Sequence, residues 1–119
     1  MRQRRPRKHD EEHLKFIRQL PCLITGARIV HAAHIRYPDP RYAKRPVGAG
    51  EKPDDKWTVP LSPEMHTDGP NAQHKSNERA WWEKQGIDPV AVAAALYCSS
   101  GDIEAGEEII REFRSARRM

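Results

Sequence analysis

The chain has 119 residues, which is enough for one domain and hardly more. Its composition, 37% hydrophobic and 32% charged, excludes a wholly disordered chain, and no apolar run approaches the roughly 18 residues of a membrane-spanning helix. The basic N-terminus is not followed by the apolar stretch of a secretory signal. We therefore expect a cytoplasmic protein with no membrane partner.

The net charge of +4 favours a polyanionic partner. Basic residues crowd the two ends of the chain, with Arg2, Arg4, Arg5, Arg7 and Lys8 at one end and Arg111, Arg114, Arg117 and Arg118 at the other. Such arms neutralise phosphates, and a solubilising tail explains them equally well. We predict a disordered basic arm over residues 1–9, with Arg4 and Arg5 on DNA, and a single domain over residues 10–119.

Residues 10–21 carry the signals of a short helix. Asp10 is a good N-cap and Pro21 ends the segment, while apolar residues recur at helical spacing between them: Leu14, Ile17 and Leu20. The next residues are rich in Ile, Val and Ala and contain a Thr25-Gly26 turn. They predict a hairpin or a bent strand over residues 28–35.

A long loop and a second strand follow. Residues 37–56 form a loop of about twenty residues, a length that is either functional or disordered in a compact domain. Five cations in it favour function: Arg41, Lys44, Arg45, Lys52 and Lys56. Residues 57–61 predict a short apolar strand, and Pro60 within it implies an edge position.

The remaining residues are mostly helical. Ser62-Pro63-Glu64 starts a helix that Asp68-Gly69-Pro70 interrupts, and a helical signal resumes from about residue 71 or 76 and ends before Gly86. A largely buried helix is predicted over residues 89–98. Asp102 caps a last helix, whose apolar stripe consists of Ile103, Ile109, Ile110 and Phe113. The fold class is therefore α+β.

Four of the six histidines gather around the two predicted strands: His31, His34, His66 and His74. Imidazole serves both as a base near neutral pH and as a metal ligand, so the cluster predicts a hydrolytic site. His31 and His34 are an odd number of residues apart, so on a regular strand they face opposite sides. His66 and His74 are two helical turns apart, and the interruption between them would shorten that distance.

The order of these motifs resembles one nuclease family. The most specific segments are Ala32-Ala33-His34-Ile35-Arg36 and the run from Gly50-Glu51-Lys52-Pro53 through Asp55 to Trp57-Thr58-Val59-Pro60-Leu61, followed by His66 and His74. Over roughly residues 13–90 the chain resembles the HNH (ββα-metal) nucleases, and among them the RecA-dependent nucleases of phages. The resemblance implies a small ββα-metal core with a long loop between the strands, flanked by helices.

The resemblance also implies roles for single residues. His34 matches the general base that deprotonates water, and His66 and His74 match the histidines that hold a divalent ion (Mg²⁺, Mn²⁺ or Zn²⁺). No Asn stands in the loop before the second strand, and Asp55 is the nearest candidate for orienting the base or for a further metal contact. His31, Asp55 or water would complete the metal site. DNA, a RecA-type filament and a bacterial host cell are implied as partners and location.

Two departures from the family pattern weaken the assignment. Relatives hold zinc with paired CxxC motifs, whereas here the two segments read Cys22-Leu23-Ile24-Thr25 and Ser62-Pro63-Glu64-Met65, so a four-thiolate zinc is excluded. Packing must replace it, and the available side chains are Leu23, Met65, Trp57 and Trp81. Ala33 stands where many relatives have a metal ligand before the base.

Other features have ordinary explanations beside functional ones. Arg36 and Lys52 would bind phosphate, or would be solvated loop residues without a role in binding. Trp81 and Trp82 would stack on bases, although at least one is expected in the core. Cys22 and Cys98 are expected to be free thiols, with Cys98 a small buried residue.

The leading hypothesis is therefore a metal-dependent DNA endonuclease from a phage or prophage, associated with recombination or repair. The alternative is a non-catalytic nucleic-acid-binding module on a degenerate HNH scaffold, which the missing cysteines, the missing Asn and Ala33 favour. A structural or partner-binding protein is a third possibility.

Overall fold

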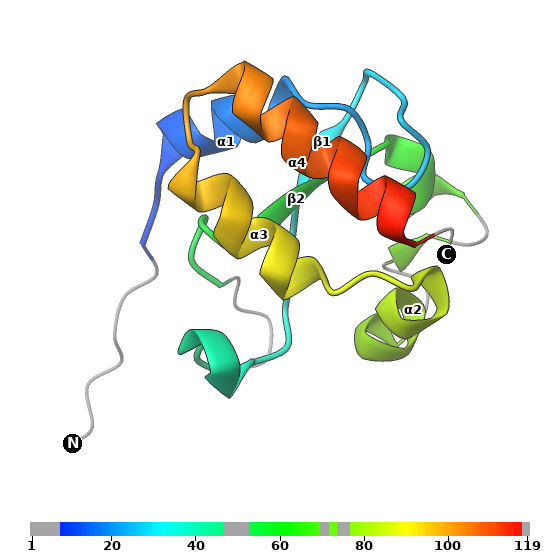
Figure 1. The fold of residues 1–119 in the computed structure, drawn as a ribbon. Coiled ribbons are helices and arrows are strands. Elements are labelled where there is room, and N and C mark those ends of the chain that lie inside the picture. Colours follow the sequence, from blue (N-terminus) through cyan, green and yellow to red (C-terminus); the bar gives the residue numbers. More distant parts are fainter. Residues whose placement is uncertain (1–7, 47–52, 70–71, 74–76, 118–119) are drawn as a thin grey trace.

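Two short strands and several helices make up the fold in a computed structural model that describes residues 8–46, 53–69, 72–73 and 77–117. In chain order the elements are α1 (Glu11–Arg18), β1 (His31–His34), η1 (Pro40–Tyr42), β2 (Thr58–Leu61), η2 (Glu64–Asp68), α2 (Glu78–Gln85), α3 (Pro89–Cys98) and α4 (Ile103–Ala116). Figure 1 shows the strands enclosed by helices, with α3 and α4 side by side. The expected α+β class is confirmed.

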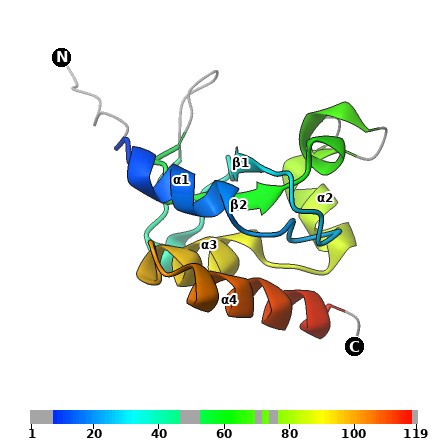
Figure 2. The same cartoon turned by 90° about the horizontal axis from the view of Figure 1, so that it is seen from above.

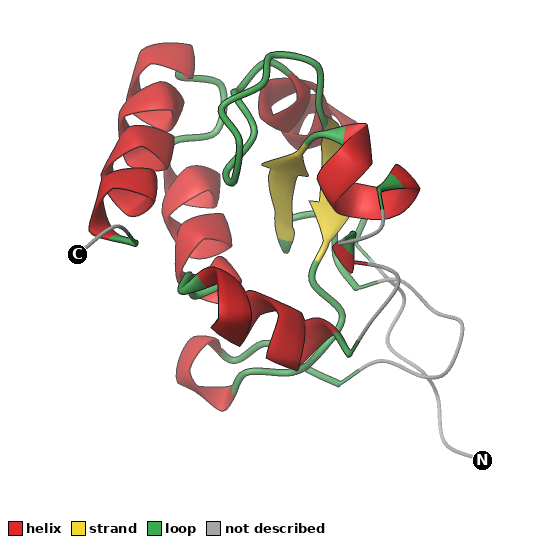
Figure 3. Cartoon of the chain, turned by 90° about the vertical axis from the view of Figure 1, so that its right-hand side faces the viewer, coloured by secondary structure: helices red, strands yellow, loops and turns green. Residues whose placement is uncertain are grey.

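The sheet is a single antiparallel pair. His31 lies opposite Leu61, and His34 lies opposite Thr58. Figure 3 shows the two strands side by side, and in a pair each strand is an edge, which is why Pro60 is tolerated. The carbonyl oxygen of Pro60 still accepts a hydrogen bond from the Leu23 amide at 2.9 Å. Strand β1 is shorter than the predicted segment 28–35.

The core lies around β2, all of whose residues are buried. This strand contacts both α1 and α3, so it has no solvated face, and Figure 2 shows how these helices lie around it. Trp57, Trp81 and Trp82 are all buried, as is Leu23, and Met65 packs against them only in part. Both Trp81 and Trp82 are therefore core residues, where at least one was expected to be.

Helices α1 and α4 begin where the sequence predicts. The side chain of Asp10 accepts a hydrogen bond from the His13 amide, and Asp102 caps α4 in the same way through Ala105. The two helices meet at Gly106, where a Cβ atom would lie 2.8 Å from both Leu20 and Phe16. Only glycine allows this close approach.

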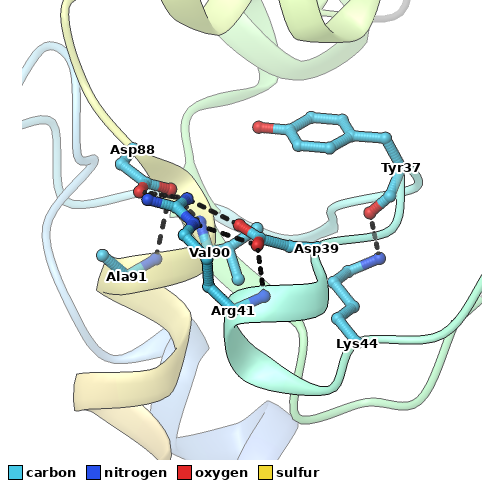
Figure 4. Close-up of polar contacts among 7 residues, drawn as sticks. All are labelled: Tyr37, Asp39, Arg41, Lys44, Asp88, Val90 and Ala91. Atoms are coloured by element: carbon cyan, nitrogen blue, oxygen red, sulfur yellow. Dashed lines mark hydrogen bonds and ion pairs between the residues drawn. The ribbon is translucent and has the colours of Figure 1, made fainter.

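The loop after β1 is folded rather than extended. Arg41 donates to both carboxylate oxygens of Asp39 and to Asp88, the N-cap of α3, as Figure 4 shows. Lys44 is buried, donates to the Tyr37 carbonyl oxygen, and burial lowers its pKa to about 8. Arg41 and Lys44, two of the five loop cations, therefore hold the fold of the loop.

The two cysteines differ in burial. Cys22 and Cys98 are free, as expected, but Cys98 is exposed, which corrects its expected burial. The reason is helical periodicity: Val90, Ala93 and Leu96 form the buried stripe of α3, and position 98 falls outside it.

Within the described ranges, no helix is both long and apolar enough to cross a membrane.

Candidate functional site

His34 and Asp55 form a polar pair at the end of the sheet. The His34 Nε2 atom lies 2.9 Å from Asp55 Oδ1, and the side chains are only 10% and 2% exposed. β1 positions His34 opposite Thr58, whose hydroxyl donates to the Asp55 carbonyl oxygen and so holds the turn before β2. A buried carboxylate on one ring nitrogen fixes the orientation and tautomer of the imidazole.

The second oxygen of Asp55 is held by the N-terminal segment. The Asp10 amide donates to Asp55 Oδ2 at 2.8 Å, and the Asp55 amide donates to the Lys8 carbonyl oxygen at 3.0 Å. The Lys8 amide donates to Asp54 Oδ1 at 2.8 Å. Residue 8, which was expected in the arm, therefore lies against the candidate site. This contact could not be predicted from the sequence, because every residue except proline carries the same backbone donor.

A second histidine pair lies at the other end of β1. His31 Nδ1 and His66 Nδ1 are 2.9 Å apart, and the rings meet edge to face with centroids 5.2 Å apart. His31 is exposed and His66 is half-buried on η2. As the odd spacing predicts, His31 and His34 have different partners, so the imidazole pair and the His34–Asp55 pair are separate.

The His31–His66 pair could supply two ligands to a transition-metal ion. Two imidazole nitrogens bound to one tetrahedral ion at ~2.0–2.1 Å each lie about 3.3 Å apart, so the rings, now at hydrogen-bond distance, would have to separate slightly. Among the residues that the structure describes, no three side chains of the ligating types gather into one group. His74, expected as a further ligand, lies outside the described residues.

The predicted DNA contacts are only partly described. Arg36 is exposed beyond the end of β1, and its backbone amide donates to Glu78 Oε1 at 3.0 Å. Arg4, Arg5 and Lys52 lie outside the described residues. Glu78 is a residue that sequence reasoning missed, because an acid in the first turn of a helix is ordinarily explained by the helix dipole.

Two turns contain the segments that the resemblance to HNH nucleases matches to zinc-binding CxxC motifs. The Cys22 Sγ atom accepts hydrogen bonds from the Ile24 and Thr25 amides at 3.4 Å each, and the Met65 amide donates to Ser62 Oγ at the same distance. Burial opposes ionisation of the Cys22 thiol, but hydrogen bonds from Thr25, Ser62 and Ile24 together lower its pKa. The two turns therefore lie against each other at Cys22 and Ser62.

Comparisons with protein-family models, with curated proteins and with solved structures find no match to this chain.

Proposed function

We propose that this protein is a metal-dependent endonuclease of the HNH (ββα-metal) type that hydrolyses DNA phosphodiester bonds. The observation that carries the proposal is the buried His34–Asp55 pair, whose histidine lies on the same short strand as His31, a member of the His31–His66 pair. Hydrolysis of a phosphodiester needs a base for water and a cation for the phosphate, and these two pairs offer the residue types for each.

The chemistry assigned to His34 follows from its contacts. Because Nε2 is paired with Asp55, the ring would act through Nδ1, taking a proton from water as the water oxygen bonds to phosphorus and the P–O3′ bond breaks. The Asp55 carboxylate would stabilise the imidazolium that forms. Its other oxygen, held by the Asp10 amide, keeps the carboxylate in place during this charge change.

His31 and His66 would hold the ion, with His74 as the further ligand that the family resemblance implies. When bound, a divalent ion supplies charge stabilisation for the phosphate and for the leaving 3′-oxygen. Mn²⁺ and Zn²⁺ suit imidazole ligands better than Mg²⁺ does.

DNA is proposed as the substrate because basic residues lie close in the sequence to the residues of the candidate site. The segment that leads from the basic arm, residues 8–10, is bonded to Asp54 and Asp55, so the arm joins the domain beside the base. Arg36 is the exposed cation nearest to His34 in the chain. A phage origin, a bacterial host cell and a RecA-type filament as partner are supported by the family resemblance alone.

The test is cleavage of supercoiled and single-stranded DNA by the wild type and by His34→Ala, in Mg²⁺, Mn²⁺ or EDTA, with and without a RecA filament. We expect metal-dependent cutting that falls ~10²–10⁴-fold in the variant. His9→Ala, which removes an exposed histidine, is the matched control and should cut like the wild type. If no DNA form is cut under any condition, the proposal is wrong.

One observation favours the alternative of a non-catalytic DNA-binding module. His31 and His34 have separate partners, so the candidate metal ligands and the candidate base are not in contact with each other. DNA binding that persists while cutting is absent even in Mn²⁺ would establish this alternative.

A further inference from the structure

Thr58, the first residue of β2, is linked to both members of the His34–Asp55 pair. It lies opposite His34 in the sheet, and its hydroxyl donates to the Asp55 carbonyl oxygen at 2.8 Å. The residue is fully buried. A single residue therefore connects the strand that carries the candidate base with the turn that carries the carboxylate partner of this base.

The hydrogen-bond pattern of the sheet brings the side chains of His34 and Thr58 close together. The Ile35 amide donates to the Trp57 carbonyl oxygen at 2.9 Å, which makes these two residues a hydrogen-bonded pair of the antiparallel ladder. The next pair, His34 and Thr58, is then a non-hydrogen-bonded one, in which the two side chains share a face and lie nearest to each other. The place of the His34 ring is thereby tied to that of Thr58.

Two hydrogen bonds close the turn that carries Asp55. The Trp57 amide donates to the Asp54 carbonyl oxygen at 3.0 Å, and the Thr58 hydroxyl donates to the carbonyl oxygen of the next residue, Asp55. A change in the backbone of Asp55 would displace its carboxylate. A hydroxyl that holds this carbonyl group therefore also holds the carboxylate against His34.

We propose that Thr58 is a positioning residue that holds Asp55 Oδ1 at hydrogen-bond distance from His34 Nε2. Because Thr58 is fully buried, it acts through this pair and does not touch the substrate. Its effect on catalysis rests on the proposed function. Misplacement of a catalytic group by about 1 Å can lower the rate ~10²-fold. Loss of the carboxylate contact would also release the choice of which ring nitrogen carries the proton.

Two substitutions separate the hydroxyl of Thr58 from its shape. Thr58→Val keeps the branched side chain but loses the donor, whereas Thr58→Ser keeps the donor and loses only the methyl group. Ile110→Val is the stability control. It truncates a fully buried side chain on α4, a helix that packs against α3, and it changes no hydrogen bond of the His34–Asp55 pair.

Each protein is characterised by DNA cleavage in Mn²⁺ and by thermal melting, with kinetics measured well below every melting temperature. We expect kcat to fall ~10–100-fold in Thr58→Val, with KM for DNA nearly unchanged because Thr58 does not contact the substrate. Thr58→Ser should restore most of kcat. Ile110→Val should melt lower and yet retain the kcat of the wild type.

A second readout, ¹⁵N NMR of the histidine rings, needs neither metal nor DNA. At alkaline pH the rings are neutral, and the ¹⁵N shifts show which nitrogen carries the proton. The His34→Ala variant identifies the signals of His34. We expect the proton on Nε2 in the wild type and in Thr58→Ser, and a mixture of both tautomers in Thr58→Val.

The outcomes separate this inference from the proposed function. A wild type that cuts DNA while Thr58→Val matches it in kcat overturns the role of Thr58 alone. Equal losses of kcat in Thr58→Ser or in Ile110→Val also overturn it, because side-chain shape or stability would then explain the loss. A wild type that cuts no DNA overturns the proposed function. Thr58 is then judged by NMR, where a mixture of tautomers in Thr58→Val supports its role and an unchanged tautomer overturns it.

Discussion

The Nδ1 atoms of His31 and His66 lie 2.9 Å apart, although 35 positions separate the two residues in the chain. A hydrogen bond between two imidazoles requires one ring to donate and the other to accept, so both cannot be protonated. Two neutral rings facing each other are also what a shared metal ion requires. The pair is brought together because β1 and η2 adjoin the same end of β2.

Removal of either ring should weaken metal binding. We expect His31→Ala and His66→Ala each to lower the affinity for Zn²⁺ or Mn²⁺ at least tenfold in calorimetric titrations, because each loses one of two ligands. His9→Ala is the control. Equal affinity of all four proteins would show that the pair holds no metal.

Replacing Asp55 should disturb the base and the fold together. Asn has one acceptor for two donors, so its amide group must face either the Asp10 amide or His34 Nε2. If the amide group faces the Asp10 amide, that backbone donor is left unpaired at a cost of about 1–3 kcal/mol. If it faces His34 Nε2, the ring proton moves to Nδ1, where it blocks the base.

We therefore expect Asp55→Asn to lower kcat for DNA cleavage ~10²–10⁴-fold and to unfold at lower urea concentration. Asp54→Asn is the matched control, since among the described residues the Asp54 side chain accepts its hydrogen bond from the Lys8 amide and not from Asp10 or His34. A wild-type kcat in Asp55→Asn would show that Asp55 has no role in catalysis.

His13 should make stability fall in mild acid. The ring is fully buried, its Nδ1 lies 2.8 Å from Ser100 Oγ, and its Nε2 has no partner among the described residues. Burial lowers the pKa of His13 below its ordinary value, although the carboxylates of Asp10 and Asp55 oppose this. The unfolded chain therefore takes up a proton near pH 6.5 while the folded chain does not.

Stability should thus be fully present above pH 6.5 and be lost as the pH falls through that value, with a slope of at most about 1.4 kcal/mol per pH unit. Urea unfolding between pH 7.5 and 5 measures the slope. His13→Phe, which keeps an aromatic ring but cannot be protonated, should flatten it, and His9→Ala should not. An identical slope in His13→Phe would assign the effect to other groups.

The adjoining turns at Cys22 and Ser62 predict that a zinc site can be introduced there by substitution. Thr25→Cys, Ser62→Cys and Met65→Cys together would supply four thiolates with Cys22, whose sulfur already accepts backbone amides. Co²⁺ should then give the absorption of a tetrahedral thiolate site. Zn²⁺ at 100 times its Kd should stabilise the protein by ~2.7 kcal/mol. The double variant Thr25→Ser, Met65→Ser, in which Ser62 is unchanged, is the control, and an octahedral Co²⁺ spectrum would show that the four positions do not converge.

Much of the local structure could be predicted from sequence, since it depends on neighbours in the chain. Asp10, Asp88 and Asp102 cap helices as their positions indicate, because an N-cap needs only an amide two or three residues away. The order of strand, loop, strand and helix was also predictable from apolar patterning. The burial of Cys98 was mispredicted because the apolar composition of a helix does not show on which side of the helix a given residue lies.

By itself the sequence determined which chemistry the chain can offer: four histidines, an aspartate before the second strand and a surplus of cations. The tertiary structure alone decided which of them meet. His34 pairs with Asp55 across 21 positions, and His31 pairs with His66 rather than with His34. The contacts of Asp10 with Asp55 and of Glu78 with Arg36 use backbone amides, which every residue but proline carries. No pattern of side chains can therefore predict them, and only the tertiary structure, in which α1 contacts both strands, brings them into place.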